Sequence, residues 1–279
     1  MNKFLLFMLA IVSLFATSCS SDDEPEINYA KDVASVYSGY TNASSTYFSD
    51  MISENQSVKV EIVSNTTVNV TFDSDTWGHT VISNAEVSLS SEGFIISGKG
   101  EAEISGHGGT KKYECNLNAV IGKNKENAKF EFSIPSVMGG LTVKFIQGEA
   151  PANLVVAGTY DGYTSTSSAY FKDMITADQK VMVTANEDGT VSISYTSDTW
   201  GVANISNIAV TKTGTGYTLV GKGTLAMPSM GGGEPKNYDC DFSGTISSSK
   251  DDVEMSFSVP SVMGGTVIKF ILGQAPATE

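Results

Sequence analysis

The sequence contains few of the residue types on which catalytic and metal centres depend. Its 279 residues include three cysteines, two tryptophans and two histidines, His79 and His107. It has no Cys-x-x-Cys pair, no Gly-x-Ser-x-Gly elbow, no phosphate-binding loop and no dinucleotide fingerprint. These absences point away from an enzyme, and they give no reason to expect a metal ion or a cofactor.

Basic residues are also scarce. Lysine and arginine total 17 against 31 acidic residues, which gives a net charge of -14. A surface of that sign repels phosphate backbones, so nucleic acid is not an expected partner. The hydrophobic content of 41% with many glycine, serine and threonine residues favours short strands joined by turns, and the length suits two domains.

Residues 1–18 have the pattern of an export signal. Lys3 provides a basic start, residues 4–15 form an apolar run, and small residues at 16–18 precede Cys19. The run is shorter than the roughly 20 apolar residues that span a bilayer. Small residues followed by cysteine resemble a bacterial lipobox, which implies lipidation of Cys19; the alternative is an ordinary secretory signal with an incidental cysteine.

Residues 19–32 are predicted to be a tether. The run Ser-Ser-Asp-Asp-Glu-Pro-Glu after Cys19 is polar and acidic, and it has no apolar periodicity. It resembles the surface-export signals of Bacteroidetes lipoproteins. The resemblance implies a lipid-anchored outer-membrane protein, with the membrane as a partner through Cys19 and the cell surface as one side that the protein could face.

The mature chain is an internal duplication. A shift of 123 residues places Tyr37-Ser-Gly-Tyr40 on Tyr160-Asp-Gly-Tyr163, and Trp77 on Trp200. A two-residue insertion near 231–235 then moves the offset to 125, which aligns the second half of each copy. The expected domains are therefore residues 33–151 and 152–279.

Apolar residues alternate with polar ones throughout each copy, as in strands buried on one face. No stretch predicts a helix longer than one turn. The second copy is expected to form strands at about 159–170, 181–185, 191–195, 203–213, 216–226, 236–247, 252–260 and 266–272. Such a series predicts an all-β fold of two tandem eight-stranded antiparallel up-and-down barrels, because closure removes exposed edges. A two-layer β-sandwich uses the same alternation and is the alternative.

The alternation also predicts which side chains face inward. Phe132 and Phe145 are expected inside the first barrel, with Lys144 outside. Cys115 and Cys240 share the phase of their apolar neighbours and are predicted to be buried free thiols. The aspartates before each tryptophan are expected to cap turns rather than to bind calcium.

On the domain length, the opening Tyr-x-Gly-Tyr strand, the eight-strand pattern and the lipobox, each copy resembles the calycin-like β-barrel domain of Bacteroidetes lipoproteins, a relative of the lipocalins. The resemblance covers about 35–151 and 157–276. The Gly-x-Trp signature of lipocalins is missing from the first strand, and tyrosines stand there instead. Lipocalin ligand preferences are therefore not transferred to this chain.

Two functions remain open for a non-enzymatic envelope protein of this kind. The first is a binding module for a small apolar ligand, held in or at the barrel mouths. The residues predicted to contact that ligand are Tyr40, Trp77, Met138, Phe145, Tyr163, Trp200, Met263 and Phe270. The alternative is a surface interaction or scaffold lipoprotein with filled barrels, a glycan-binding or inhibitory accessory. A hydrolase built around His79 or His107 would require a nucleophile and an acid beside one of them.

Overall fold

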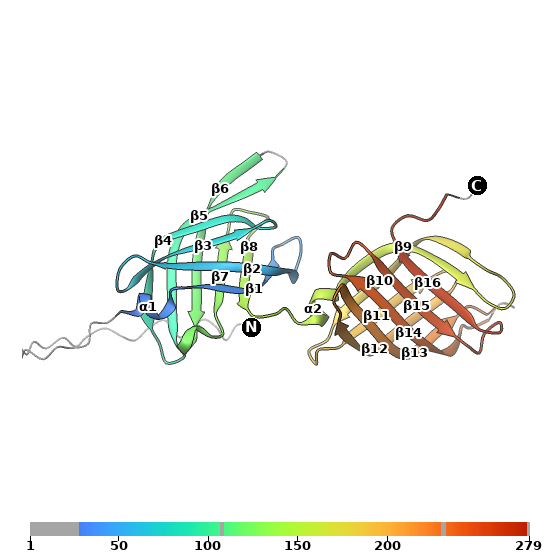
Figure 1. Cartoon of the computed structure of the whole chain (residues 1–279). Helices are drawn as coiled ribbons and strands as arrows, with labels where there is room; N and C mark the ends of the chain where they lie inside the picture. Colours follow the sequence, from blue (N-terminus) through green and yellow to red (C-terminus); the bar gives the residue numbers. More distant parts are fainter. Residues whose placement is uncertain (1–27, 107–108, 230–232, 278–279) are drawn as a thin grey trace, which may run out of the picture.

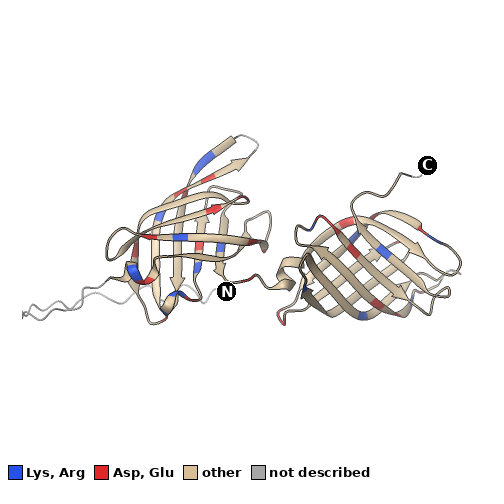
Figure 2. Cartoon of the chain, viewed as in Figure 1, with Lys and Arg blue, Asp and Glu red and all other residues tan. Residues whose placement is uncertain are grey.

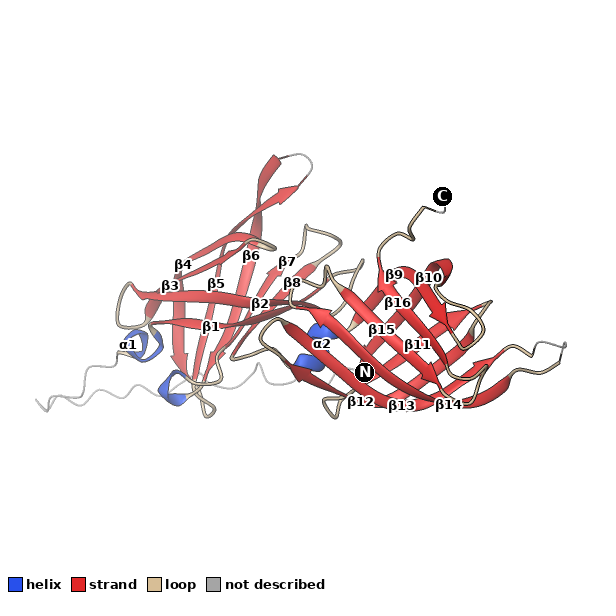
Figure 3. Ribbon diagram, turned by 45° about the vertical axis from the view of Figure 1, so that its right-hand side comes forward, coloured by secondary structure: helices blue, strands red, loops and turns tan. Residues whose placement is uncertain are grey.

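Two closed antiparallel barrels, one for each repeat, form the protein (Figures 1 and 3). The computed structural model describes residues 28–106, 109–229 and 233–277. In each barrel every strand pairs with the next strand along the chain, and the last strand pairs with the first. The predicted up-and-down barrels are therefore confirmed, and the β-sandwich alternative is wrong.

The strands of the second barrel lie close to their predicted ranges, except that the second of them begins at residue 174 instead of 181. The first barrel consists of β1 (Ser35–Ser44), β2 (Met51–Ile62), β3 (Thr67–Ser74), β4 (Gly78–Leu89), β5 (Phe94–Gly106), β6 (Gly109–Ile121), β7 (Lys129–Ile134) and β8 (Leu141–Gln147). The second consists of β9 (Gly158–Ser167), β10 (Met174–Ala185), β11 (Val191–Ser197), β12 (Gly201–Lys212), β13 (Gly216–Met227), β14 (Lys236–Ser247), β15 (Val253–Val259) and β16 (Thr266–Leu272). A 3-10 helix, η1 (Lys123–Lys125), joins β6 to β7.

Period-two alternation places the apolar side chains inside the barrels. Phe132 on β7 and Phe145 on β8 are buried, as predicted, whereas Lys144 between the inward positions of β8 is exposed. The ammonium group of Lys144 lies 3.8 Å from the carboxylate of Glu131, which stands opposite it on β7. The inward side chains of the sixteen strands therefore form two separate cores, one in each barrel.

A single-turn helix closes one end of each barrel: α1 (Tyr29–Val33) in the first and α2 (Ala152–Val156) in the second. We call this end the base and the opposite end the mouth. The two helices are held in the same way. The Tyr37 hydroxyl donates to the Val33 carbonyl at 2.6 Å, and the Tyr160 hydroxyl donates to the Val156 carbonyl at 2.7 Å. Each first strand thus fixes the helix that precedes it.

Helix α1 corrects the predicted extent of the tether. Its first four residues fall within the range 19–32 that the sequence assigned to a solvated linker, yet Ala30 is fully buried in the core together with Val33. Asn28 caps the helix by accepting a hydrogen bond from the Lys31 amide at 3.0 Å. The first domain therefore includes the chain from Asn28 onward. Cys19 and the predicted export signal lie outside the described residues.

The described ranges contain only short helices: α1 and α2 have five residues each and η1 has three. No helix in them is long and apolar enough to cross a lipid bilayer.

The two cysteines of the described chain are buried free thiols, as the alternation predicted. Cys115 on β6 and Cys240 on β14 occupy equivalent positions in the two barrels. Burial raises the pKa of each thiol to about 11. The thiols therefore stay protonated at neutral pH and pack as small apolar groups.

The turn before each tryptophan is capped by serine rather than by aspartate. The Ser74 hydroxyl accepts hydrogen bonds from the amides of Thr76 and Trp77, each at 3.2 Å. The Ser197 hydroxyl does the same for Thr199 and Trp200. The sequence correctly indicated a capped turn but assigned the cap to the neighbouring residue, because both side chains carry a suitable oxygen.

Candidate functional site

The barrel interiors, where the sequence placed part of the ligand site, are occupied by aromatic rings. Phe145 is fully buried, and its ring centroid lies 5.7 Å from that of Phe130. Phe72 stacks on Phe132 at 5.1 Å. These distances are those of aromatic pairs in contact. Phe145 therefore fills the core of the first barrel.

The second interior is filled in the same manner. Tyr195 stacks on Phe257 at a centroid distance of 5.1 Å, and Phe242 meets Phe257 at 5.2 Å. Phe270 is fully buried within the same core. The residue equivalent to Phe145 thus has the same structural role.

The tryptophans lie beneath the barrel mouths as plugs. Trp77 is only 6% exposed, and its indole stacks on Phe48 with centroids 5.9 Å apart. The indole N–H donates to the Thr41 hydroxyl at 3.0 Å. Trp200 stacks on Phe171 in the same way. This geometry is that of a structural plug and not of an aromatic wall that is open to a ligand.

The methionines belong to the last loop at each mouth. Met138 is 49% exposed, whereas Met263 is half-buried. The Thr46 hydroxyl donates to the Met138 carbonyl at 3.0 Å, and the Ala169 amide donates to the Met263 carbonyl at 3.2 Å. Each methionine loop is therefore fastened to the loop that follows the first strand of its barrel.

Tyr40 lies away from the mouth. It is buried but is not part of the first core, and it lines a cleft where the two barrels meet. Burial raises the pKa of its hydroxyl. Tyr163, its equivalent, is half-buried on β9. The eight predicted residues therefore lie in the two cores, the two plugs, the two methionine loops and the outer wall of the barrels.

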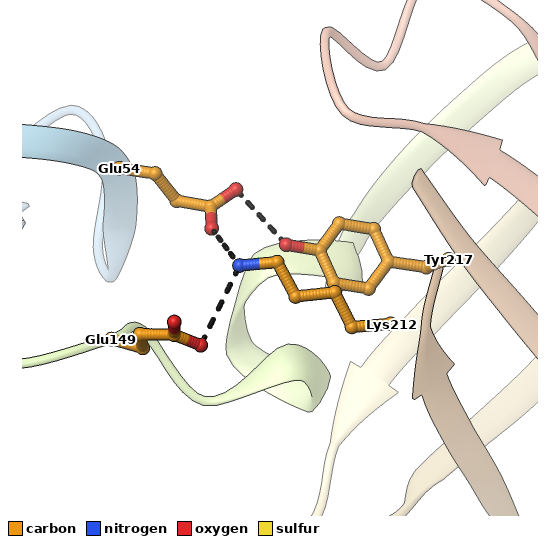
Figure 4. A network of polar contacts seen from close by, with 4 residues as sticks. All are labelled: Glu54, Glu149, Lys212 and Tyr217. Atoms are coloured by element: carbon orange, nitrogen blue, oxygen red, sulfur yellow. Dashed lines mark hydrogen bonds and ion pairs between the residues drawn. The ribbon is translucent and has the colours of Figure 1, made fainter. Parts of the chain in front are cut away.

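The barrels meet through four polar side chains shown in Figure 4. The Tyr217 hydroxyl donates to Glu54 at 3.0 Å. The Lys212 ammonium lies 3.5 Å from the other oxygen of Glu54 and 3.7 Å from the carboxylate of Glu149. Burial, together with the hydrogen bond and negative charge of Glu54, raises the pKa of Tyr217 to about 12. Glu54 and Glu149 thus bind the base of the second barrel to the first.

A β-bulge aims Glu54 at the second barrel. The register between β1 and β2 shifts between Gly39 and Thr41, and Asn55 takes a positive φ of 56°. A bulge adds unpaired residues to one strand and redirects their side chains. Ile52, just before the bulge, packs against the core cluster of the second barrel. The junction therefore combines an apolar contact with the polar network.

Two clefts flank this network. The first, with a volume of 490 Å³, is lined by Tyr40, Gln56, Glu149 and Lys212, among others. The second, with a volume of 690 Å³, lies between the mouth side of the first barrel and the base of the second. Its lining includes Asp50, Met51, Asp75, Leu154 and Lys250. Burial lowers the pKa of Lys250, and the charge of Glu54 opposes that shift.

The histidines contribute no catalytic constellation to the described structure. His79 Nδ1 contacts an Asp73 carboxylate oxygen on the exposed β3–β4 hairpin. His107 lies outside the described residues. In the part of the chain that the structure describes, no group of three or more histidine, cysteine or acidic side chains is placed to hold a metal ion.

Comparison with known proteins identifies the family. The model of the calycin-like beta-barrel domain matches residues 33–147 and again residues 156–271. The chain belongs to this family. Each match covers one barrel, so the calycin-like domain occurs here as a tandem pair. No curated protein matches the sequence significantly.

Two solved structures resemble this chain to very different degrees. A protein of Bacteroides fragilis, itself proposed to be an outer membrane protein, is 24% identical; the match covers 89% of this chain and all of that one, with a TM-score of 0.66. A protein of unknown function from Nostoc punctiforme is 10% identical, with coverages of 88% and 99% and a TM-score of 0.25. The first match supports the two-barrel fold.

The four junction residues are among the many positions at which the two calycin-like copies differ. Glu54 and Glu149 correspond to Ala177 and Gln274, and Lys212 and Tyr217 correspond to Leu89 and Phe94. Matching residues of a duplication preserve the common core, whereas differing polar residues mark a role specific to one copy. Because many positions outside this network also differ between the copies, for example His79 and Val202, the comparison alone would not have singled out the network.

Proposed function

We propose that this chain is a non-enzymatic lipoprotein of the bacterial cell envelope that acts through the outer surface of two filled barrels. The observation that carries the proposal is the ring packing around Phe130, whose centroid lies between 5.5 and 6.4 Å from those of Tyr37, Phe132 and Phe145. An eight-stranded barrel is about wide enough to be filled by its own side chains. Because the rings fill the interior, a partner would bind to the outer surface of the barrels.

The location in the envelope rests on the N-terminal sequence. An apolar run and small residues precede Cys19, and acidic residues follow it. The structurally similar protein of Bacteroides fragilis is itself proposed to be an outer membrane protein. Both support an outer-membrane protein anchored by lipid on Cys19.

The partner surface that we favour is the junction. Ligand sites occur preferentially between domains and have volumes of roughly 300–1,000 Å³. The cleft of 690 Å³ combines the carboxylates of Asp50 and Asp75 with the amide of Asn55 and the apolar side chains of Met51 and Ile52. The carboxylates accept hydrogen bonds from hydroxyl groups, and the asparagine amide both accepts and donates them. Apolar side chains suit the C–H faces of a sugar ring. A glycan of the cell surface is the partner that fits this lining.

The test uses the Cys19→Ser protein purified without detergent. A glycan array should reveal binding that Asp75→Ala weakens at least tenfold. The matched control is Asp198→Ala, the same change at the equivalent position of the second barrel, which lies outside the cleft lining. Equal losses of glycan affinity from both substitutions, or binding that neither substitution affects, would show that the glycan does not bind at the junction.

Native mass spectrometry of the same protein distinguishes filled barrels from ligand carriers. We expect the mass of the chain alone, and no added mass with fatty acids or sterols. A stoichiometric apolar molecule would instead support the first function predicted from the sequence. That function stays a prediction for the eight residues named above. It requires the Trp77 and Trp200 plugs to move, so quenching of their fluorescence by the apolar ligand would accompany binding.

Labelling with a fatty acid tests the lipidation of Cys19 separately. Cells supplied with a labelled fatty acid should yield labelled wild-type protein and unlabelled Cys19→Ser protein. The Cys19→Ser protein should remain folded and soluble, because Cys19 precedes the first buried residue of the described chain, Ala30. Unlabelled wild-type protein would contradict the anchor.

A further inference from the structure

The base of the first barrel exposes a ring of large apolar side chains. They are between 38% and 61% exposed, whereas most large apolar residues of the described chain are buried. The ring consists of Val36, Ile62, Val63, Leu89, Ile95 and Val120. We call this set the basal collar.

Strand pairing places the collar around one end of the barrel. Ile95 on β5 stands directly opposite Val120 on β6, and Leu89 ends β4 beside Phe94. Val36 lies near the start of β1, and Ile62 is the last residue of β2. Helix α1 contacts β2, β4 and η1 at the same end. The collar therefore surrounds the point at which the chain enters the barrel.

The second barrel lacks this feature. The residues equivalent to the collar, in the same order, are Thr159, Ala185, Asn186, Lys212, Thr218 and Thr245. The base of the second barrel has a partner, because Lys212 and Tyr217 bind Glu54 of the first barrel. Only the first barrel, which follows the predicted anchor, has the collar. The fold that the two barrels share therefore does not require these apolar side chains.

We propose that the basal collar contacts the lipid surface to which the chain is anchored; this inference rests on the proposed lipidation of Cys19. Nine residues, 20–28, separate Cys19 from α1. At a maximum of about 3.6 Å per residue they span roughly 30 Å, so the anchor keeps this end of the barrel near the membrane. A lipid anchor combined with a second, weaker contact holds a protein more firmly than either does alone.

The charges at the base are compatible with that contact. Four lysines and four carboxylates lie at this end of the barrel, which is therefore close to neutral, whereas the whole chain carries -14 and the segment before α1 adds Asp22, Asp23, Glu24 and Glu26. Figure 2 shows both kinds of charge near α1. These residues are Lys31, Lys123, Lys125 and Lys129, with Asp32, Glu61, Glu92 and Glu126. A neutral end avoids the repulsion that anionic headgroups exert on the rest of the surface.

Other partners fit the collar less well. Between Cys19 and α1 the sequence Ser-Ser-Asp-Asp-Glu-Pro-Glu-Ile-Asn offers, besides proline, one apolar side chain, Ile27, which is too small to cover the six residues of the collar. A second copy could present an apolar face, but the anchor holds a lipid surface within reach of every molecule. Self-association is therefore kept as an outcome of the test.

The experiment places an environment-sensitive nitrobenzoxadiazole dye at Leu89→Cys in the Cys19→Ser background. The protein is attached by a hexahistidine tag before residue 20 to vesicles of phosphatidylethanolamine and phosphatidylglycerol that contain nickel-chelating lipid. This attachment replaces the natural anchor, so the collar is tested even if Cys19 is not lipidated. Buried Cys115 and Cys240 do not compete for the dye.

We expect at least a twofold rise in emission, with a blue shift, when the Leu89 dye meets vesicles. The matched control is the same dye at Val220→Cys, an exposed apolar position of the second barrel, which should not change. Replacing Val36, Ile95 and Val120 by threonine, the residue of the second copy at each position, should abolish the Leu89 response while the circular dichroism spectrum is retained.

Equal responses at both dyes, or none at Leu89, would overturn the proposal. A response that depends on protein concentration without vesicles would assign the collar to self-association and also overturn it.

Discussion

Tyr195 donates a hydrogen bond to the side-chain oxygen of Gln179 at 3.0 Å inside the second barrel. Phe72 stands at the equivalent position in the first barrel, where the side-chain oxygen of Gln56 is buried and has no hydrogen-bond partner among the described residues. A buried acceptor without a donor costs about 1–3 kcal/mol. The second barrel therefore makes a buried hydrogen bond that the first barrel lacks.

Phe72→Tyr should complete the contact in the first barrel. The added hydroxyl reaches Gln56 if the first barrel accommodates it as the second accommodates Tyr195. We expect the free energy of unfolding of the first barrel to rise by about 1 kcal/mol. Urea unfolding of the Cys19→Ser protein, followed by hydrogen exchange of peptides from each barrel, measures the change. The control is Tyr195→Phe, which should destabilise only the second barrel, by about 1–3 kcal/mol. Destabilisation by Phe72→Tyr would show that the first barrel cannot accommodate the hydroxyl.

The two thiols should be inert in the folded protein. Burial raises the pKa of Cys115 and Cys240 to about 11, so little thiolate forms at pH 8. In the Cys19→Ser protein, a disulfide reagent should label neither thiol over several hours at pH 8 and both in urea. Ser91→Cys, in the exposed β4–β5 turn, is the reactive control. Rapid labelling of Cys115 without denaturant would mean that β6 separates from its neighbours.

High pH should destabilise both barrels through their basal tyrosines. Burial raises the pKa of Tyr37 and Tyr160 from 10.0 to about 12. The folded state then holds these protons more tightly, so their contribution is intact below pH 10 and is lost as the pH rises toward 12. The urea midpoint should fall across that interval. Tyr37→Phe should reduce the slope for the first barrel alone, and an unchanged slope would contradict the assignment.

The first barrel should require Asn28 to Ala30 when it is produced separately. The sequence predicted that residues 31–151 and 153–279 fold on their own, and this stays a prediction. Fragment 31–151 lacks the Asn28 cap and buried Ala30, so we expect fragment 28–151 to be more stable by about 1–3 kcal/mol. Thermal unfolding compares them. Equal stability would indicate that α1 does not contribute to the isolated barrel.

The parts of the fold that the sequence predicted depend on local periodicity. Phe132 and Lys144 obey a two-residue alternation that either strand shows by itself. Helix α1 has only five residues, too few for a helical period, and it forms where Ala30 and Val33 can enter the core. Its existence depends on tertiary burial that no local pattern records.

The candidate site was less accessible to prediction, because its contacts are distant in sequence. Glu54 and Tyr217 are 163 positions apart, and a bulge in β2 turns Glu54 toward its partner. Bulges leave no clear mark on an alternating pattern. The sequence could have shown which way Tyr40 points. Side chains alternate along a strand and Tyr37 faces inward, so Tyr40, three positions later, faces outward.

The even number of strands has a consequence for how such a domain can be duplicated within one chain. Because β1 starts and β8 finishes at the base, the polypeptide enters and leaves the first barrel at the same end. Four residues, 148–151, then suffice to reach α2 of the next barrel. A whole gene segment could therefore be copied in line without threading the chain through an existing core. The two copies then diverged on the outside, at positions such as 54, 89 and 212, and also inside the barrels, where Phe72 of the first core corresponds to Tyr195 of the second.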